Sequence, residues 1–215
     1  PSGSSTAGAG QFWWRISGTA GCRLAQARPG RVAYTTGSLA ATRWTLAPDI
    51  TNGKGQLITA KLSIVSPKSC VVKLLEIKEI PAPKTAIHML VAPTKNINRF
   101  EWFLEKATEL GVYKITPVLC DRSERKHIKY ERFEKIIHAA LKQSLRAYAP
   151  ILEPLTPLKE IEVNRPTFIA HCEDSPKESL KSAVNGQANC SILIGTEGDF
   201  SKAEIAWANE QNITA

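Results

Sequence analysis

Short apolar runs alternate with amphipathic helical patterns over the second half of the chain. The runs are Ala86–Val91, Ile115–Leu119, Thr167–His171 and Ser191–Ile194. Strands that alternate with helices predict a mostly parallel sheet covered by helices, so the expected fold class is α/β. Because ligands of such sheets bind beyond the carboxyl ends of the strands, functional residues are expected directly after these runs.

Two segments between these runs have the pattern of amphipathic helices. In the first, Asn98 is the expected N-cap, Glu101 follows three residues later, and Gly111 is the expected stop after Leu110. The second is longer and covers residues 130–148, with an apolar stripe that ends before a proline.

A smaller β module precedes the alternating region. Asn52–Gly55 is a turn signal, and Gln56–Ser63 and Val71–Ile80 alternate in the way that half-buried strands do. Ser66–Ser69 is a second turn signal between the two runs. The stiff Pro81–Pro83 linker then marks an expected domain boundary.

The first fifty residues differ in composition from the rest. They contain five Arg, no Lys, and only seven Leu, Ile, Val or Phe residues. Neither a helical nor a strand period is visible in residues 10–48. Two interpretations are open: a flexible basic arm, or a mistranslated segment read in a wrong frame. We favour the second, and both predict poor order here.

Composition limits the classes of function. The 28 Lys and Arg residues exceed the 20 Asp and Glu residues, and the formal net charge of +8 favours an anionic partner such as RNA. No apolar run approaches the roughly 20 residues that span a bilayer, so no membrane association is expected. The five scattered cysteines and four histidines have no disulfide or metal-ligand spacing, which favours a cytoplasmic protein without a metal.

The segment from Ile194 to Ser201 is the strongest local signal. A strand runs into Gly195-x-x-Gly198, and Ser201 with Glu204 then gives the signature of a capped helix. Glycines at this place allow a ligand to approach the backbone closely. The spacing matches neither a P-loop nor a dinucleotide fingerprint, and a simple tight turn remains an alternative.

Polar residues off the apolar stripes predict a basic rim above the strand ends. Such a rim would contact phosphates, although a solvated surface would have the same composition. The candidates are Lys95, Arg99, Lys106, Arg122, Lys142, Gln143 and Arg146.

Several patterns coincide in a fixed order along the chain. Arg99-Phe100-Glu101-Trp102 precedes Lys106-Ala107-Thr108-Glu109-Leu110-Gly111-Val112, and Asp121-Arg122-Ser123-Glu124, Lys142-Gln143-Ser144-Leu145-Arg146 and Ile194-Gly195-Thr196-Glu197-Gly198-Asp199-Phe200-Ser201 follow. Together they closely resemble the RsmE family, which are methyltransferases of the SPOUT superfamily. The resemblance covers residues 51–215.

The resemblance implies a fold and an activity. Residues 84–215 would form a SPOUT-type domain with a trefoil knot, residues 51–80 would be the remnant of a PUA-like β-barrel, and residues 1–50 would be atypical. The family transfers a methyl group from S-adenosylmethionine (SAM) to N3 of a uridine in 16S ribosomal RNA of the small subunit, and its members are homodimers without a metal.

The sequence also departs from the family pattern. Thr196 and Ala139 stand where members often have Pro and Glu. The family's Leu-Gly-x-Arg-Ile-Leu-Arg-x-Glu-Thr-Ala motif is absent, so the domain is expected to be incomplete at its carboxyl end. We therefore expect weak SAM binding and slow turnover, or none, from this chain.

The resemblance assigns roles to the candidate residues. The cofactor would lie against His171, Glu173 and the segment Ile194, Gly195, Thr196, Glu197 and Gly198, and the seven residues of the basic rim would bind RNA. Arg99 and Glu197 are candidate catalytic residues, and the general base is unassigned. Glu197 would lie near the sulfonium or cap a helix, and both hypotheses stay open. Two other functions are an inactive RNA-binding protein of the same fold and a metabolite-binding α/β protein.

Overall fold

The computed structural model describes residues 13–15, 22–24, 34–36, 49–65 and 70–215. The chain divides into two compact units. One contains residues 1–82 together with 141–148, and the other contains residues 83–140 and 149–215.

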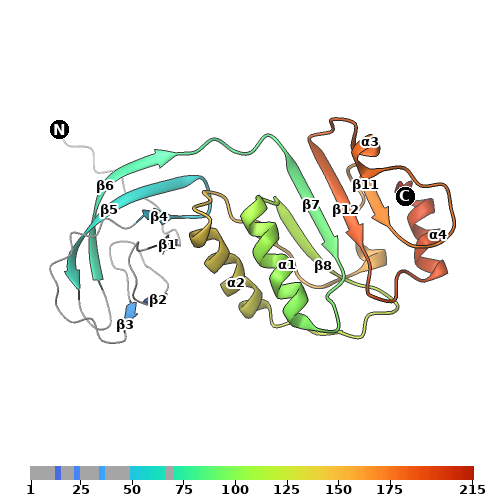
Figure 1. Cartoon of the computed structure of the whole chain (residues 1–215), viewed down its shortest axis with the longest axis horizontal. Coiled ribbons are helices and arrows are strands. Elements are labelled where there is room, and N and C mark those ends of the chain that lie inside the picture. Colours follow the sequence, from blue (N-terminus) through green and yellow to red (C-terminus); the bar gives the residue numbers. More distant parts are fainter. Residues whose placement is uncertain (1–12, 16–21, 25–33, 37–48, 66–69) are drawn as a thin grey trace. The chain divides into compact units, whose positions relative to one another are not determined.

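The first unit is built from antiparallel strands. Its main sheet has the order β1 (Trp13–Arg15), β4 (Asp49–Thr51), β5 (Gln56–Val65) and β6 (Cys70–Glu79) (Figure 1). The predicted runs 56–63 and 71–80 are confirmed as the hairpin partners β5 and β6. The predicted turn at 66–69 lies outside the described residues.

Short strands also occur within the first fifty residues. Besides β1, β2 (Cys22–Leu24) pairs with β3 (Tyr34–Thr36) in an antiparallel arrangement. No sequence pattern indicated these strands, because three residues are too few for an alternation to be recognised. The rest of that stretch before Asp49 lies outside the described residues.

The turn between β4 and β5 holds the segment 141–148 within this unit. The Gly55 amide donates to the Ala147 carbonyl at 2.9 Å, and the Tyr148 hydroxyl donates to the Ile80 carbonyl at 2.9 Å. Gly55 has a φ of 104°, and a Cβ at this position would lie 2.5 Å from the Tyr148 hydroxyl oxygen. Both observations require glycine here.

The second unit contains the predicted parallel sheet. Its strand order is β10 (Thr156–Pro157), β8 (Lys114–Leu119), β7 (Ala86–Val91), β12 (Asn189–Ile194) and β11 (Thr167–Ala170), with β9 (Ile151–Leu152) also paired to β8. Neighbouring strands are parallel in every pair of this sheet that the structure describes. The prediction of an α/β fold with a mostly parallel sheet is confirmed.

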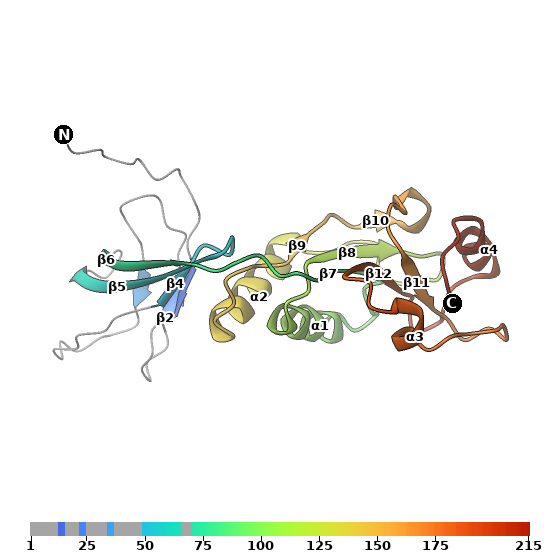
Figure 2. The ribbon, with the colours of Figure 1, turned by 90° about the horizontal axis from the view of Figure 1, so that it is seen from above.

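Helices cover both faces of this sheet. Figure 2 shows α1 (Ile97–Leu110) and α3 (Leu180–Val184) on one face and α4 (Lys202–Glu210) on the other. The remaining helices are α2 (Tyr130–Gln143) and the 3-10 turn η1 (Leu158–Glu160). No helix in the described ranges is both long enough and apolar enough to cross a membrane.

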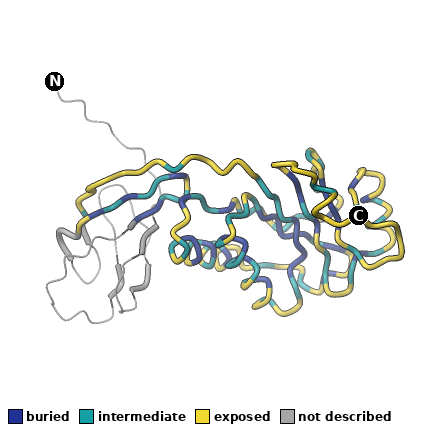
Figure 3. The backbone as a smooth tube through the Cα atoms, turned by 45° about the horizontal axis from the view of Figure 1, so that its top comes forward, coloured by how far each residue is buried: buried dark blue, intermediate teal, exposed yellow. Residues whose placement is uncertain are grey.

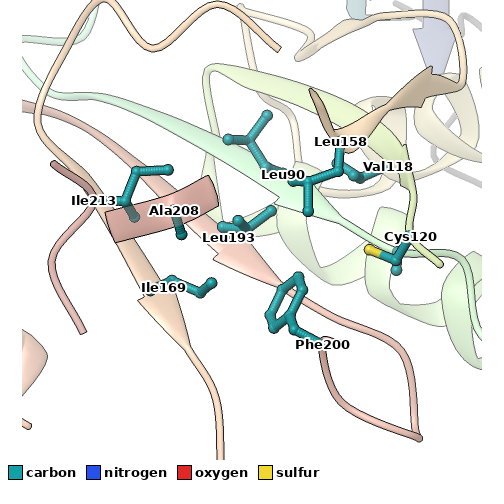
Figure 4. Close-up of a cluster of buried hydrophobic side chains, with 10 residues drawn as sticks. Leu90, Val118, Cys120, Leu158, Ile169, Leu193, Phe200, Ala208 and Ile213 are labelled. Atoms are coloured by element: carbon teal, nitrogen blue, oxygen red, sulfur yellow. The ribbon is translucent and has the colours of Figure 1, made fainter. Parts of the chain in front are cut away.

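Buried apolar side chains hold these layers together. On one face, Val91 and Ile115 pack with Phe100, Leu104 and Phe133. The other face carries a second cluster, in which the Phe200 ring points toward residues of the sheet and α4 (Figure 4). In Figure 3 the strands of this unit are mostly dark blue or teal, whereas many of the connecting loops are yellow. Burial of each such large side chain contributes about 1.5–3 kcal/mol.

The ends of the helices correct two predictions. The N-cap of α1 is Asn96 rather than Asn98, because the Asn96 side chain accepts the Asn98 amide at 3.1 Å. The predicted stop at Gly111 is confirmed, with a φ of 86°. Helix α2 ends at Gln143, five residues before the predicted end at 148.

The early end of α2 has a clear geometric cause. Leu145 has a φ of 52°, and the Arg146 amide donates to the Leu141 carbonyl at 3.1 Å. This is the hydrogen-bond pattern of a Schellman motif, in which the left-handed position is normally glycine. Because a leucine occupies it here, the end of α2 could not be recognised from the residue types.

The environment of His88 predicts that the protein loses stability in mild acid. Its Nε2 lies 2.8 Å from Thr116 Oγ1, and burial, with smaller contributions from Lys114 and Arg165, lowers its pKa from 6.5 to about 4. The unfolded chain therefore takes up a proton below pH 6.5 while the folded chain does not, so stability falls between pH 6.5 and pH 4.

Thermal unfolding at pH 7.5 and pH 5 measures this loss. Because solvent screens this partly exposed group, we expect the free energy of unfolding to fall by about 1 kcal/mol at pH 5, which corresponds to a fall of about 2–4 °C in Tm. The His88→Gln variant should lack that part of the pH dependence. An equal pH response in both proteins would contradict the assignment to His88.

Candidate functional site

Four loops meet at the carboxyl edge of the parallel sheet. They follow β7, β8, β12 and β11, and comprise residues 92–96, 120–125, 195–201 and 171–174. The register between β11 and β12 pairs Ala170 with Ile194, so His171 and Gly195 begin neighbouring loops. This is the edge at which ligands of parallel α/β sheets bind.

The turn after β12 is shaped by contact between Gly195 and Phe200. A Cβ on Gly195 would lie 2.9–3.1 Å from three carbons of the Phe200 ring, which is 1% exposed. Only glycine therefore fits without movement of a buried aromatic ring. At Gly198, in contrast, the nearest atom to an added Cβ is Arg122 Cδ at 3.6 Å, an ordinary contact.

Ser201 and Glu204 form the predicted cap of α4 and also hold a second loop. The Ser201 amide donates to Glu204 Oε2 at 2.8 Å, and the Glu204 amide donates to Ser201 Oγ at 3.2 Å. The Asp121 amide donates to Glu204 Oε1 at 2.8 Å, and Ser201 Oγ donates to Asp121 Oδ2 at 2.6 Å. Glu204 is 1% exposed, so this carboxylate joins two loops inside the protein.

Glu197 connects the loop after β12 to the loop after β7. Its carboxylate accepts the backbone amide of Lys95 at 3.1 Å. Ser201 and Glu204 cap α4, so Glu197 is not the cap of this helix. The carboxylate stays exposed, and it positions the backbone of Lys95 at the edge of the site.

The loop after β12 is also fixed to the two remaining loops. The Arg122 guanidinium donates to the Gly198 carbonyl at 2.6 Å. On the other side, the Cys172 amide donates to Asp199 Oδ2 at 2.8 Å, and Asp199 has a φ of 62°. Every other loop of this edge is therefore hydrogen-bonded to residues 197–204.

A cavity of about 350 Å³ lies beside the end of β11. Its walls are mainly apolar and include Phe168, Ile192 and Leu180, with His171 and Cys172 at the strand end. His171 Nδ1 is buried and has no hydrogen-bond partner. A buried, unpaired ring nitrogen next to an apolar cavity can accept or donate a hydrogen bond to a bound molecule.

The buried cysteine of this edge, Cys120, is not a nucleophile. Burial, followed by the charge of Glu204, raises the pKa of the Cys120 thiol to about 12, so it stays protonated and is a poor nucleophile. The described residues contain no group of three or more His, Cys, Asp or Glu side chains that could hold a metal ion.

Known proteins resemble this chain mainly over its parallel-sheet unit. Residues 81–215 match the family model described as RNA methyltransferase domain. Ribosomal RNA small subunit methyltransferase E from Helicobacter pylori (strain J99) is 30% identical over 77% of this chain and 74% of its own length. The chain belongs to the ribosomal RNA small subunit methyltransferase E (RsmE) family.

Solved structures support the fold of this RsmE family chain. A crystal structure of a probable rRNA-methyltransferase from Porphyromonas gingivalis is 29% identical, with a TM-score of 0.73 over 80% of this chain and 76% of that one. The Neisseria gonorrhoeae RsmE structure bound to S-adenosyl methionine has a TM-score of 0.68 over 77% of this chain and 72% of that one; at 20% identity, it indicates the fold alone. This chain spans 64% of the length of the Rickettsia conorii relative.

Several predicted RNA-binding residues already have ionic or hydrogen-bond partners. Lys95 pairs with Glu124 at 2.9 Å, and Lys106 pairs with Glu105 at 2.9 Å and Glu109 at 3.1 Å. Arg99 is exposed in the first turn of α1, close in sequence to the loop after β7.

The other three predicted RNA-binding residues belong to the antiparallel unit. Lys142, Gln143 and Arg146 lie in the segment 141–148, whereas Lys95, Arg99, Lys106 and Arg122 lie in the parallel-sheet unit. Burial lowers the pKa of Lys142 from 10.5 to about 8, which still leaves most of its population charged at pH 7.

Among the predicted cofactor residues, the structure gathers those at the ends of β11 and β12. Ile194–Gly198 and His171 begin adjacent loops, and Glu173 is exposed in the loop that His171 begins. Sequence reasoning missed Asp121 and Asp199, which bind the neighbouring loops. Both residues lie in the motifs of the resemblance, but their roles were not predicted because their partners are distant in sequence.

Proposed function

We propose that this RsmE family protein transfers a methyl group from SAM to N3 of a uridine in 16S ribosomal RNA of the small subunit. The observation that carries the proposal is the turn at residues 195–201, to which the loops after β7, β8 and β11 are all hydrogen-bonded. The family match and the relatives' names support the same reaction.

The residues at this edge fit the proposed cofactor. The apolar cavity beside β11 suits an adenine ring, and the unpaired His171 Nδ1 offers one polar contact within it. The backbone amides and carbonyls of Ile194–Gly198 would bind the cofactor, in a turn where Gly195 lets the chain pass close to the buried Phe200 ring. When bound, SAM supplies a methyl group on a sulfonium for in-line displacement.

The chain's own residues would hold and orient the reactants. Glu197 and Arg122 keep the turn after β12 rigid through contacts with Lys95 and Gly198, so that its backbone has one arrangement. Positioning of this kind matters because the reacting atoms must approach to about 3–3.5 Å. Arg99, exposed at the start of α1, is a candidate to orient the RNA, whose target base must be unpaired or flipped out to expose N3.

The basic residues of both units would bind the RNA backbone. We infer that Lys95, Arg99, Lys106 and Arg122 contact RNA near the reacting base and that Lys142, Gln143 and Arg146 contact it from the antiparallel unit. Affinity that depends on phosphate contacts falls as salt rises.

The same proposal extends to finer features of the fold. We infer that the parallel-sheet unit is a SPOUT domain with a trefoil knot, that the antiparallel unit is a PUA-like barrel, and that the protein is a homodimer. In support of the first, β12 lies between β7 and β11 although it follows both in the chain. A crystal structure and sedimentation analysis of the protein test these three statements.

The function is tested by binding and by methyl transfer. SAM should bind saturably in calorimetry, and tritiated methyl groups should appear in small ribosomal subunits or in 16S RNA, at N3 of uridine by mass spectrometry. The His171→Ala variant should bind SAM more weakly, whereas Lys159→Gln, a change on exposed η1, should not. Absence of both binding and transfer would overturn the proposal, and RNA binding without SAM binding would identify an inactive RNA-binding protein.

A further inference from the structure

A basic depression lies at the carboxyl edge, between the loops after β7 and β8. It has a volume of about 310 Å³ and is lined by Lys95, Glu124, Arg125, Lys126 and His127. Three of these side chains are cationic and one is anionic, so the lining carries an excess of positive charge.

The walls of this depression are held in place by contacts between the two loops. The Arg125 guanidinium donates through Nη2 to the Lys95 carbonyl at 2.8 Å, and through Nε to the Thr94 carbonyl at 3.4 Å. Glu124 is paired with Lys95 at 2.9 Å, so its charge is compensated. At the base of the second loop, the Cys120 amide donates to the buried Ser123 hydroxyl at 2.9 Å.

Lys126 and His127 complete the depression from its exposed side. Both side chains are solvent-exposed, and no hydrogen bond or ion pair joins either to another part of the described chain. Arg125 and Glu124 thus fix the shape, while Lys126 and His127 are available to an incoming anion. A preorganised depression of this kind binds an anion with little loss of conformational freedom.

The depression adjoins the proposed methyl-transfer site. The backbone amide of Lys95, one of its lining residues, donates to the Glu197 carboxylate in the turn after β12 at 3.1 Å. An anionic group in the depression would therefore lie close to this turn.

We propose that this depression binds a backbone phosphate of the RNA substrate, next to the nucleotide that is methylated. The inference rests on the proposed function, because it takes RNA as the substrate. A phosphodiester carries one negative charge and two acceptor oxygens, which match an ammonium and the neighbouring N–H donors. The carboxylate of the methyl donor is the competing source of an anion at this place.

The test compares Lys126→Gln with Lys159→Gln in the full chain. Binding of fluorescently labelled single-stranded oligouridylate is measured over a range of salt concentrations, and SAM binding is measured separately by calorimetry. Lys126→Gln should weaken oligouridylate binding by about 5–10-fold at low salt and lower the slope of log K against log salt by about 0.7, the value for one lost phosphate contact on a single strand. Lys159→Gln should leave both quantities, and SAM affinity, unchanged.

Two outcomes would overturn the inference. Equal RNA affinity and equal salt slope in the two variants would show that the depression holds no phosphate of RNA. A loss of SAM affinity without a loss of RNA affinity would assign it to the donor's carboxylate instead. Because neither measurement requires methyl transfer, a failure of the proposed catalytic activity is detected separately.

Discussion

A Gly195→Ala variant should lose SAM affinity by about tenfold or more, together with methyl transfer. The added Cβ would lie 2.9–3.1 Å from three carbons of the Phe200 ring, and the shortest of these distances is one that Cβ atoms in proteins essentially never show. Phe200 is 1% exposed and belongs to the cluster that contains Leu193, so its ring has little space into which to move. The turn after β12 must shift instead, and the other loops are hydrogen-bonded to this turn.

The size of the effect follows from the cost of overpacking. Extra atoms in a packed interior cost about 1–3 kcal/mol, and about 1.4 kcal/mol corresponds to a tenfold change in binding. Part of the same cost should appear as a fall in Tm of about 2–8 °C. Calorimetry with SAM and thermal unfolding measure the two parts.

Gly198→Ala is the matched control. Its Cβ would make only ordinary van der Waals contacts, the nearest with Arg122 Cδ at 3.6 Å, so we expect affinity within about threefold of the parent. In a Gly195→Ala, Phe200→Leu double variant, the smaller side chain should restore part of the affinity. If both glycine variants were equally impaired, the Phe200 ring would not be the cause.

The sequence predicted the elements of the fold where their signals are local. Alternating apolar runs gave the strands of the parallel sheet, and Gly111 and the Ser201–Glu204 box marked helix ends correctly. The end of α2 was missed because Leu145 takes the left-handed conformation that glycine normally takes. Asn96 and Asn98 are both good caps, and only the backbone geometry decides between them.

The site was predictable only in part, since its contacts join residues far apart in the chain. The sequence placed Gly195 and His171 at strand ends, and the register of β11 and β12 shows that these two strands are neighbours. It did not indicate that Glu197 binds the Lys95 amide or that Glu204 binds the Asp121 amide, over separations of 102 and 83 residues. Such pairings depend on the strand order, and β12 between β7 and β11 was not evident from the sequence.

Glu204→Ala should be the most destabilising single change at this edge. The substitution removes the buried carboxylate to which the amides of Ser201 and Asp121 each donate at 2.8 Å. Hydrogen bonds to a charged group contribute about 1.5–3 kcal/mol each. We expect a loss of about 3–5 kcal/mol in the free energy of unfolding.

Chemical denaturation separates this effect from a general effect of losing a charge. Glu210→Ala removes an exposed carboxylate from the last residue of α4 and should change stability by less than about 0.5 kcal/mol. Glu204→Gln keeps the size of the side chain and one acceptor oxygen, so its loss should be intermediate. Equal stability of the Glu204→Ala and Glu210→Ala variants would contradict a structural role for the buried carboxylate. A stability loss that decreases from Glu204→Ala to Glu204→Gln to Glu210→Ala would indicate that hydrogen bonds to Glu204 hold the loops after β8 and β12 together. These three variants keep none, some and all of those hydrogen bonds, respectively.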